Sequence, residues 1–296
     1  MRTPDERFAG LPGYHYEPRY TEALPGFAPL GMHYADEGPS DAPVALCLHG
    51  QPTWAYLYRK MIPAFLTAGM RVIAPDFFGF GRSDKPTDES FYTFGFHRKA
   101  IMALIEQLDL KDSTLVCQDW GGLIGLTIPM DMPSRFSRLI VMNTALATGD
   151  QPLTEGFLAW RAYCNRTPDM DIGALMKRGV AGLSDAEAQA YAAPFPDASF
   201  KAGVRRFPNL VPDHPEAEGA ALSRRARDFW STEWNGLSFM AIGMKDPVLG
   251  PPVMRALRGF IRNCPEPLEL AEAGHFTQEA GAIIVERALE WFKRQA

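Results

Sequence analysis

The sequence predicts an α/β protein, with a mostly parallel sheet that has helices on both faces and is interrupted by a helical insertion. Short apolar runs alternate with helical stretches along the first half of the chain. Several of these runs lead through a glycine-containing turn into a helix, as in the βα unit of a parallel sheet. The chain has 296 residues, 46% of them hydrophobic, which is enough to bury a large core.

The elements follow from the local pattern along the chain. Two extended segments within Tyr14–Asp36, punctuated by Pro and Gly, predict an antiparallel hairpin. Compact apolar runs predict strands at Val44–Leu48, Met70–Pro75, Thr114–Gln118, Arg138–Asn143, Leu237–Gly243 and Pro267–Leu270. Helical patterns cover Tyr56–Thr67, Phe94–Leu108, Leu123–Met130, Gly156–Tyr163, Ser184–Ala192 and Ala282–Lys293.

The alternation breaks over residues 148–222, which are rich in Ala, Pro, Met and aromatic residues. This segment is longer than an ordinary connection between elements. We therefore predict a core domain made of residues 1–147 and 223–296, with a helical cap domain at 148–222.

Composition excludes several classes of function. The net charge of −5 gives no electrostatic reason to bind nucleic acid or an anionic membrane surface. The polar amino terminus has no apolar core for a signal peptide, and no run approaches the length of a membrane span. The four cysteines lack metal-like spacing, so we expect buried thiols, no metal and a cytoplasmic protein.

The loop after Asp76 is glycine-rich but has neither a Gly-Lys-Ser/Thr ending nor a GxGxxG pattern, so we expect a structural turn there, not a phosphate site. A more informative stretch follows the strand at Thr114–Gln118. Asp119 stands alone between that strand and a helix, and the glycines at 121 and 122 allow a sharp turn. This is the pattern of a nucleophile elbow with Asp at the reactive position. An Asp that caps the next helix fits the stretch equally well.

Two more polar residues stand just past strand ends. Asp246 follows the strand Leu237–Gly243, and His275 follows the last short strand. Alone, Asp246 before a proline is a turn residue, and His275 is a loop histidine bonded to backbone. Loops after the carboxyl ends of parallel strands converge on one edge, so Asp119, Asp246 and His275 are expected to meet. Their order, nucleophile, acid and histidine, favours a catalytic triad.

An Asp nucleophile implies particular chemistry. A carboxylate is charged at neutral pH and needs no base to attack a saturated carbon that bears a good leaving group. The resulting ester would be hydrolysed by water that His275 activates, while Asp246 orients the imidazole. The backbone N–H groups of Gln51 and Trp120 are placed to hold the oxyanion.

The chain resembles haloalkane dehalogenases of the α/β-hydrolase superfamily. The matching segments are His-Gly-Gln-Pro-Thr-Trp (49–54), the following Tyr-Leu-Tyr-Arg-Lys-Met-Ile-Pro, Ala-Pro-Asp-Phe-Phe-Gly-Phe-Gly-Arg-Ser-Asp-Lys-Pro (74–86), Gln-Asp-Trp-Gly-Gly (118–122) and Ala-Gly-His-Phe (273–276). With cap segments they cover most of the chain. The subgroup typified by the 1,2-dichloroethane-degrading enzyme looks closest, because its acid follows the later strand, as Asp246 does. Asn143 occupies the place where other subgroups put the acid.

This resemblance implies an α/β-hydrolase fold and the hydrolysis of short haloalkanes to a primary alcohol, halide and a proton, with no cofactor. It also implies a halide site made by the indole N–H groups of Trp120 and Trp160. Cap positions that match the family's apolar pocket are Phe157, Phe207, Pro208 and Val211, any of which is also compatible with ordinary cap core. Leu123 stands where the subgroup has Phe, and Gln51 where it has Glu. Expected partners are the haloalkane, halide and water, for a monomeric enzyme.

The main rival is an epoxide hydrolase with the same Asp-His-Asp apparatus. That reaction needs cap tyrosines to protonate the opening ring, and Tyr163 and Tyr191 are available. A fluoroacetate-type dehalogenase would need arginine where Trp120 stands, and a serine esterase would need Ser at position 119. A non-catalytic binding protein of this fold usually has a broken triad, whereas every member is present here.

Overall fold

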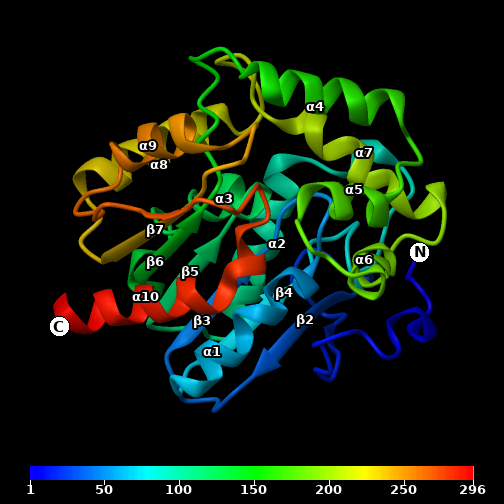
Figure 1. Ribbon diagram of the computed structural model, residues 1–296, viewed down its shortest axis with the longest axis horizontal. Coiled ribbons are helices and arrows are strands. Elements are labelled where there is room, and N and C mark those ends of the chain that lie inside the picture. The colour runs from blue at the N-terminus through cyan, green and yellow to red at the C-terminus, as the bar shows by residue number, and fades with distance from the viewer. Residues whose placement is uncertain (296) are drawn as a thin grey trace.

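An eight-stranded sheet forms the centre of the molecule, in a computed structural model that describes residues 1–295 (Figure 1). The strand order is β1-β2-β4-β3-β5-β6-β7-β8. The strands are β1 (Arg19–Thr21), β2 (Met32–Glu37), β3 (Val44–Leu48), β4 (Arg71–Pro75), β5 (Ser113–Cys117), β6 (Phe136–Met142), β7 (Leu237–Gly243) and β8 (Leu268–Leu270). β2 pairs antiparallel with β1 and β4, and the other pairs are parallel. The predicted hairpin and the mostly parallel sheet are therefore confirmed.

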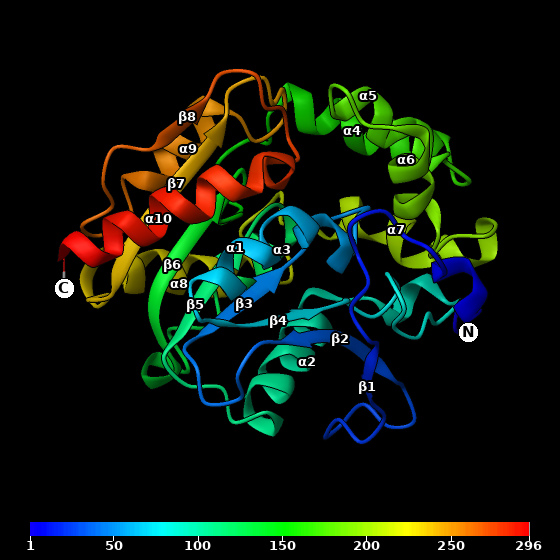
Figure 2. The ribbon, with the colours of Figure 1, turned by 60° about the horizontal axis from the view of Figure 1, so that its bottom comes forward.

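Helices connect the strands and cover both faces of the sheet. The α-helices are α1 (Ile62–Thr67), α2 (Phe94–Gln107), α3 (Trp120–Gly125), α4 (Glu155–Arg166), α5 (Ile172–Gly179), α6 (Asp185–Ala192), α7 (Ala202–Arg206), α8 (Ala220–Thr232), α9 (Pro251–Arg258) and α10 (Gly281–Gln295). The short 3₁₀ helices are η1 (Asp5–Phe8), η2 (Ala55–Lys60), η3 (Glu89–Phe91), η4 (Pro133–Arg135), η5 (Ala198–Lys201), η6 (Phe207–Leu210) and η7 (Thr277–Ala280). α1 and α10 pack together on one face, and α2 and α3 lie together behind the sheet (Figures 1 and 2).

The central strands are buried on both faces. Every residue of β3 and of β5 is buried, which explains why these strands read as continuous apolar runs without alternation. Cys47 and Cys117 belong to these strands, and the four cysteines are free thiols, of which Cys47, Cys117 and Cys164 are buried as expected and Cys264 is only partly buried. The sheet therefore gives the loops at its carboxyl edge a rigid base.

The segment that carries α4 to α7 forms a separate layer over the carboxyl edge of the sheet (Figure 2). The side-chain amide of Gln51 donates to the carbonyl of Val204 in α7, and the indole of Trp54 donates to the carbonyl of Ala190 in α6. Side chains cap the N-termini of two of these helices: Thr154 caps α4, and Ser184 with Glu187 forms a capping box on α6. The boundaries 148–222 for a cap domain stay a prediction.

Two predicted helices differ from the structure. The helix expected at Tyr56–Thr67 is two pieces, η2 and α1, and Pro63 falls in the first turn of the second, where a missing N–H costs nothing. The helix expected at Leu123–Met130 is α3, which begins directly after Asp119 and ends at Gly125. Beyond Gly125 the backbone bonds shorten to three residues, and Pro129 has no N–H to continue the helix.

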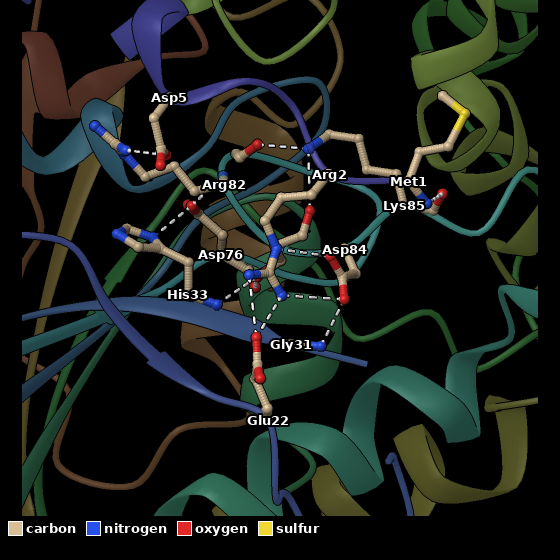
Figure 3. A network of polar contacts seen from close by, with 12 residues as sticks. Met1, Arg2, Asp5, Glu22, Gly31, His33, Asp76, Arg82, Asp84 and Lys85 are labelled. Carbon is tan, nitrogen blue, oxygen red and sulfur yellow. Dashed lines mark hydrogen bonds and ion pairs between the residues drawn. The ribbon is translucent and has the colours of Figure 1, made fainter. Parts of the chain in front are cut away.

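The loop after β4 is a structural turn, as expected, and a buried carboxylate organises it (Figure 3). Asp76 accepts hydrogen bonds from the ring Nδ1 of His33 at 2.7 Å and from the backbone N–H of Arg82 at 2.8 Å. Its other oxygen accepts from the N–H of Ala55 at 2.8 Å, at the start of η2. Burial raises the pKa of Asp76, but the charge and hydrogen bond of His33 outweigh it and lower the pKa to about 2. Asp76 thus joins β2, the β4 loop and η2 into one unit.

Among residues 1–295, no helix is both long enough and apolar enough to cross a bilayer.

Candidate active site

The turn from β5 into α3 places the carboxylate of Asp119 at the carboxyl edge of the sheet. Asp119 has φ 51° and ψ −125°, a strained backbone conformation that non-glycine residues rarely adopt outside functional sites. Gly121 is required here, since a Cβ at that position would lie 1.9 Å from the carbonyl oxygen of Leu48. Gly50 is required for the same reason, since its Cβ would lie 2.4 Å from the Asp119 carboxylate. The local sequence therefore builds the predicted elbow.

The structure brings the three predicted catalytic residues together. His275 lies in the loop between β8 and η7, and its Nδ1 is 2.8 Å from Oδ2 of Asp246. Its Nε2 is 3.5 Å from Oδ2 of Asp119. The imidazole therefore bridges two carboxylates that come from different loops.

Asp246 is held in place by several donors. Its Oδ1 accepts from the backbone N–H groups of Val248 and Leu249, and its Oδ2 accepts from the side-chain amide of Asn143 at 2.9 Å. Burial raises the pKa of Asp246, but the charge of His275 and these hydrogen bonds lower it to about 2. Asp246 is thus a fixed negative charge beside Nδ1. Asn143, at the end of β6, supports this carboxylate as a hydrogen-bond donor.

His275 experiences opposing effects. Burial lowers its pKa, but the charge of Asp246 and the hydrogen bonds to both carboxylates raise that pKa to about 10. The part that comes from Asp119 depends on its negative charge. Any reaction that neutralises Asp119 therefore lowers the pKa of His275, so that a larger fraction of the imidazole is neutral at a given pH.

The loop after β3 supplies a donor to the same carboxylate. The backbone N–H of Gln51 donates to Oδ1 of Asp119 at 2.8 Å. His49 fixes this loop: its Nδ1 lies 2.8 Å from the carbonyl of Gly50, and its Nε2 accepts from the N–H of Phe77 at 3.0 Å. The second predicted donor, the N–H of Trp120, belongs to the residue directly after Asp119. Both predicted oxyanion donors thus flank the nucleophile.

Trp291, on α10, does not line the cavity, and its buried N–H has no partner among residues 1–295. The other five tryptophans divide into two groups. The indole N–H groups of Trp54, Trp230 and Trp234 donate to Ala190, Leu126 and Ser238 inside the protein. The indoles of Trp120 and Trp160 both line the cavity that contains Asp119. Among residues 1–295, neither of these two N–H groups has a hydrogen-bond acceptor. Trp120 and Trp160 are therefore the indoles whose donors remain for a ligand in the cavity.

The cavity lies between the cap layer and the sheet edge and has a volume of about 1250 Å³. Its lining is mostly apolar and includes the predicted pocket residues Leu123, Phe157 and Val211. It also includes residues that sequence reasoning missed, in the loop after β6 and the loop after β7: Leu146, Leu153, Val248 and Leu249. These loops have no periodic pattern that would have identified them.

Two predicted pocket residues do not line this cavity. Phe207 is fully buried and packs against Trp120 and Phe80, with ring centroids 4.6 Å apart in each pair. Pro208 is also buried, within η6. Both belong to the cap core, and Phe207 supports the Trp120 ring from behind.

No group of three or more His, Cys, Asp or Glu side chains within residues 1–295 is arranged to hold a metal ion. Asp119, Asp246 and His275 line the cavity together with Glu279. Its other charged lining residues are Asp150, Arg178, Arg227, Lys245 and Glu272. A carboxylate nucleophile, a histidine between two carboxylates, and unbonded N–H donors in an apolar cavity can form and hydrolyse an ester.

Comparison with known proteins adds independent findings. Residues 43–282 match the family model for the alpha/beta hydrolase fold. The chain is 44% identical to the haloalkane dehalogenase of Psychrobacter cryohalolentis, over 94% of this chain and 93% of that one. It is 41% identical to the haloalkane dehalogenase of Mycobacterium marinum, over 98% and 99% of the two chains. The tetrameric structure of haloalkane dehalogenase DpaA from Paraglaciecola agarilytica superposes with a TM-score of 0.96 at 51% identity, covering 98% and 97%.

Proposed function

The chain belongs to the haloalkane dehalogenases, which are hydrolases with the alpha/beta hydrolase fold. On that premise we propose that Asp119, Asp246 and His275 hydrolyse the carbon–halogen bond of the substrate. The observation that carries this proposal is the geometry around His275. One imidazole contacts the nucleophile at 3.5 Å and the supporting acid at 2.8 Å, at the floor of an apolar cavity. The substrate class is a short haloalkane, with water as the second reactant.

In the first step, Oδ2 or Oδ1 of Asp119 attacks the carbon that bears the halogen. The new carbon–oxygen bond forms as the carbon–halogen bond breaks, and the electron pair leaves with the halide. The indole N–H groups of Trp120 and Trp160 line the same cavity and would bind the departing anion. An indole donor does not protonate the leaving group. Of the cations that also line the cavity, Arg227 is paired with Asp150, Lys245 is paired with Glu272, and Arg178 donates to the hydroxyl of Tyr163.

In the second step, water attacks the carbonyl carbon of the Asp119 ester. His275 takes the water proton at Nε2, and the fixed charge of Asp246 stabilises the imidazolium that forms at Nδ1. The N–H of Gln51, which contacts Oδ1 of Asp119 in the structure, holds the oxyanion together with the N–H of Trp120. When this intermediate collapses, the bond to the alkoxide oxygen breaks, and that oxygen takes the proton from His275 and leaves as the alcohol. The carboxyl group loses the second water proton to solvent, which restores the carboxylate.

The epoxide hydrolase alternative has less structural support. It requires a phenol that points at the ring oxygen, and neither Tyr163 nor Tyr191 lines the cavity. Tyr191 is fully buried, where its hydroxyl bonds to Glu279 and Arg59. The hydroxyl of Tyr163 accepts from Arg178 at 3.4 Å. The two unbonded indoles in the cavity favour a halide over an epoxide oxygen.

The test is a competition between the two chemistries. The protein is incubated separately with 1-bromobutane and with styrene oxide, and bromide release and diol formation are measured. We expect bromide release and no diol. Diol formation without bromide release would move the assignment to epoxides.

A further inference from the structure

Gln118 directly precedes the nucleophile and takes no part in the reaction described so far. It follows the last residue of β5, and its side chain is fully buried. Gln278, on η7 three residues after the catalytic histidine, is also fully buried. Two buried amides beside one imidazole require an explanation, because buried polar groups are costly unless they are hydrogen-bonded.

The contacts of Gln118 converge on His275. Its Nε2 lies 2.9 Å from the ring Nε2 of His275 and donates to the backbone carbonyl of the same residue at 3.1 Å. The Nε2 of Gln278 donates to Oε1 of Gln118 at 3.4 Å. Gln118 therefore holds both the ring and the backbone of the base.

These contacts fix the orientation of the Gln118 amide. The carbonyl of His275 needs a donor, which only the NH₂ group can be, and the NH₂ group of Gln278 needs an acceptor, which only Oε1 can be. Gln278 keeps this orientation although its own Oε1 is buried without a partner among residues 1–295. The pair is thus arranged to present an N–H to Nε2 of the imidazole.

An N–H donor at 2.9 Å fits a ring nitrogen that carries a lone pair and conflicts with one that carries a proton. We propose that Gln118, held by Gln278, is a positioning residue that keeps Nε2 of His275 unprotonated and aimed at the ester, ready to accept a proton from water. This inference rests on the proposed role of His275 as the base. When water arrives, it takes the place of one Gln118 N–H as the hydrogen-bond partner of the ring Nε2. The other N–H of Gln118 keeps its bond to the carbonyl of His275.

The charges around His275 show why such a donor is useful. Asp119 and Asp246 face the ring from two loops and favour an imidazolium, which cannot accept a proton from water. The nearby Glu279 is paired with Arg59 and Lys60, and Lys245 is paired with Glu272, so these groups add little net charge. The two carboxylates raise the pKa of His275, and a donor to the neutral ring lowers it. Gln118 therefore opposes the effect of the triad carboxylates.

The test compares Gln118→Met, which keeps the length and loses the donor, with Gln107→Met as a matched control. Gln107 lies on α2 and bonds to Thr21, remote from the triad. Each protein is mixed with 1,2-dibromoethane, and mass spectrometry follows the formation and decay of the ester on Asp119 across a range of pH. We expect Gln118→Met to raise the pH midpoint of ester decay by about one unit or more, because a donor to the neutral form no longer lowers the pKa. Gln107→Met should leave the midpoint unchanged.

A second measurement separates this role from general packing. The ¹⁵N signals of the His275 ring, followed across pH, should report loss of the Nε2 proton while Nδ1 keeps its proton, and this loss should occur at a lower pH in the wild-type protein than in Gln118→Met. Gln278→Met should shift the pH midpoint of ester decay and the ring ¹⁵N signals in the same direction but by less. If Gln118→Met does not fold, Gln278→Met tests the proposal in its place. An unchanged pH midpoint and unchanged ring signals, with the ester still forming on Asp119, would overturn this inference alone. If no ester forms on Asp119 even in the wild type, the proposed function itself fails.

Discussion

At the scale of single residues, the proposed halide site depends on which indoles keep a free N–H donor. Trp160 lines the cavity with its N–H unbonded, whereas the N–H of Trp234 is used by Ser238. We expect Trp160→Phe to weaken bromide binding by about tenfold or more, since a hydrogen bond to a charged group contributes about 1.5–3 kcal/mol. Trp234→Phe is the matched control and should leave bromide affinity unchanged. Titration with bromide, followed by tryptophan fluorescence, measures both, and equal affinities in the two variants would remove Trp160 from the site.

His97 makes a residue-scale prediction about stability. It is fully buried among Phe77, Tyr92 and Phe207, neither ring nitrogen has a partner among residues 1–295, and burial lowers its pKa to about 3. The folded pKa is below the ordinary value near 6.5, so the unfolded chain binds a proton first, and stability falls as the pH drops from 6.5 toward 3. At pH 5 this costs about 2 kcal/mol, at 1.36 kcal/mol per unit.

The substitution His97→Leu should remove this contribution. We expect its free energy of unfolding to depend less on pH than that of the wild type between pH 7 and 5, whatever the change at pH 7. Urea unfolding at both pH values gives the comparison. A pH dependence equal to that of the wild type would show that His97 does not titrate as we infer.

At the scale of elements, hydrogen bonds within the loop after β4 stabilise the fold near the proposed active site. Asp76 bonds the backbone of Ala55 at the start of η2, the backbone of Arg82 and the ring of His33. We expect Asp76→Ala to destabilise the protein by about 3 kcal/mol or more, because it leaves several buried donors without an acceptor. Asp84→Ala, which breaks a more exposed pair with Arg2, should cost less. Thermal unfolding of the two variants measures both losses of stability. Equal losses in Asp76→Ala and Asp84→Ala would mean that Asp76 has no special role in stabilising the fold.

Most elements could be predicted from the sequence because their patterns are local. The buried strands are continuous apolar runs, and the turn into α3 is marked by adjacent glycines, so β5 and the elbow were recognisable. The early end of α3 was missed although Pro129 marks it in the sequence, because the three-residue backbone bonds that end the helix before Pro129 show only in the fold. Phe207 and Pro208 were wrongly assigned to the pocket, because a resemblance gives a residue's position in the chain but not the side on which its ring packs.

At the scale of the whole molecule, the site is made of loops that are distant in sequence. Parallel strands bring Asp119, Asp246 and His275 to one edge, so their convergence could be predicted from order and placement alone. The partners Gln118 and Gln278 could not, because a buried amide gives no sequence signal of what it contacts. Our expectation of a monomer also stays a prediction, and the relative DpaA is described as tetrameric.

The cavity makes a whole-molecule prediction about substrate size. A volume of about 1250 Å³ exceeds what a two-carbon dihalide fills, and Leu123 stands on its wall. We expect kcat/KM for 1-bromohexane to be at least as high as for 1-bromobutane, because each added methylene buries apolar surface worth about 0.8 kcal/mol. Leu123→Phe should reduce the hexane value more than the butane value. Bromide release gives all four numbers, and a preference for the shorter chain in the wild type would contradict this.

The central claim is that Asp119 forms a covalent ester that His275 hydrolyses. The most direct measurement is mass spectrometry of His275→Phe after incubation with 1,2-dibromoethane, with the same variant carrying Asp119→Ala as the control. The account predicts one bromoethyl group on the peptide that contains Asp119, one bromide released per protein molecule, and no adduct in the control. An adduct on another residue, or continued turnover without any adduct, would contradict it.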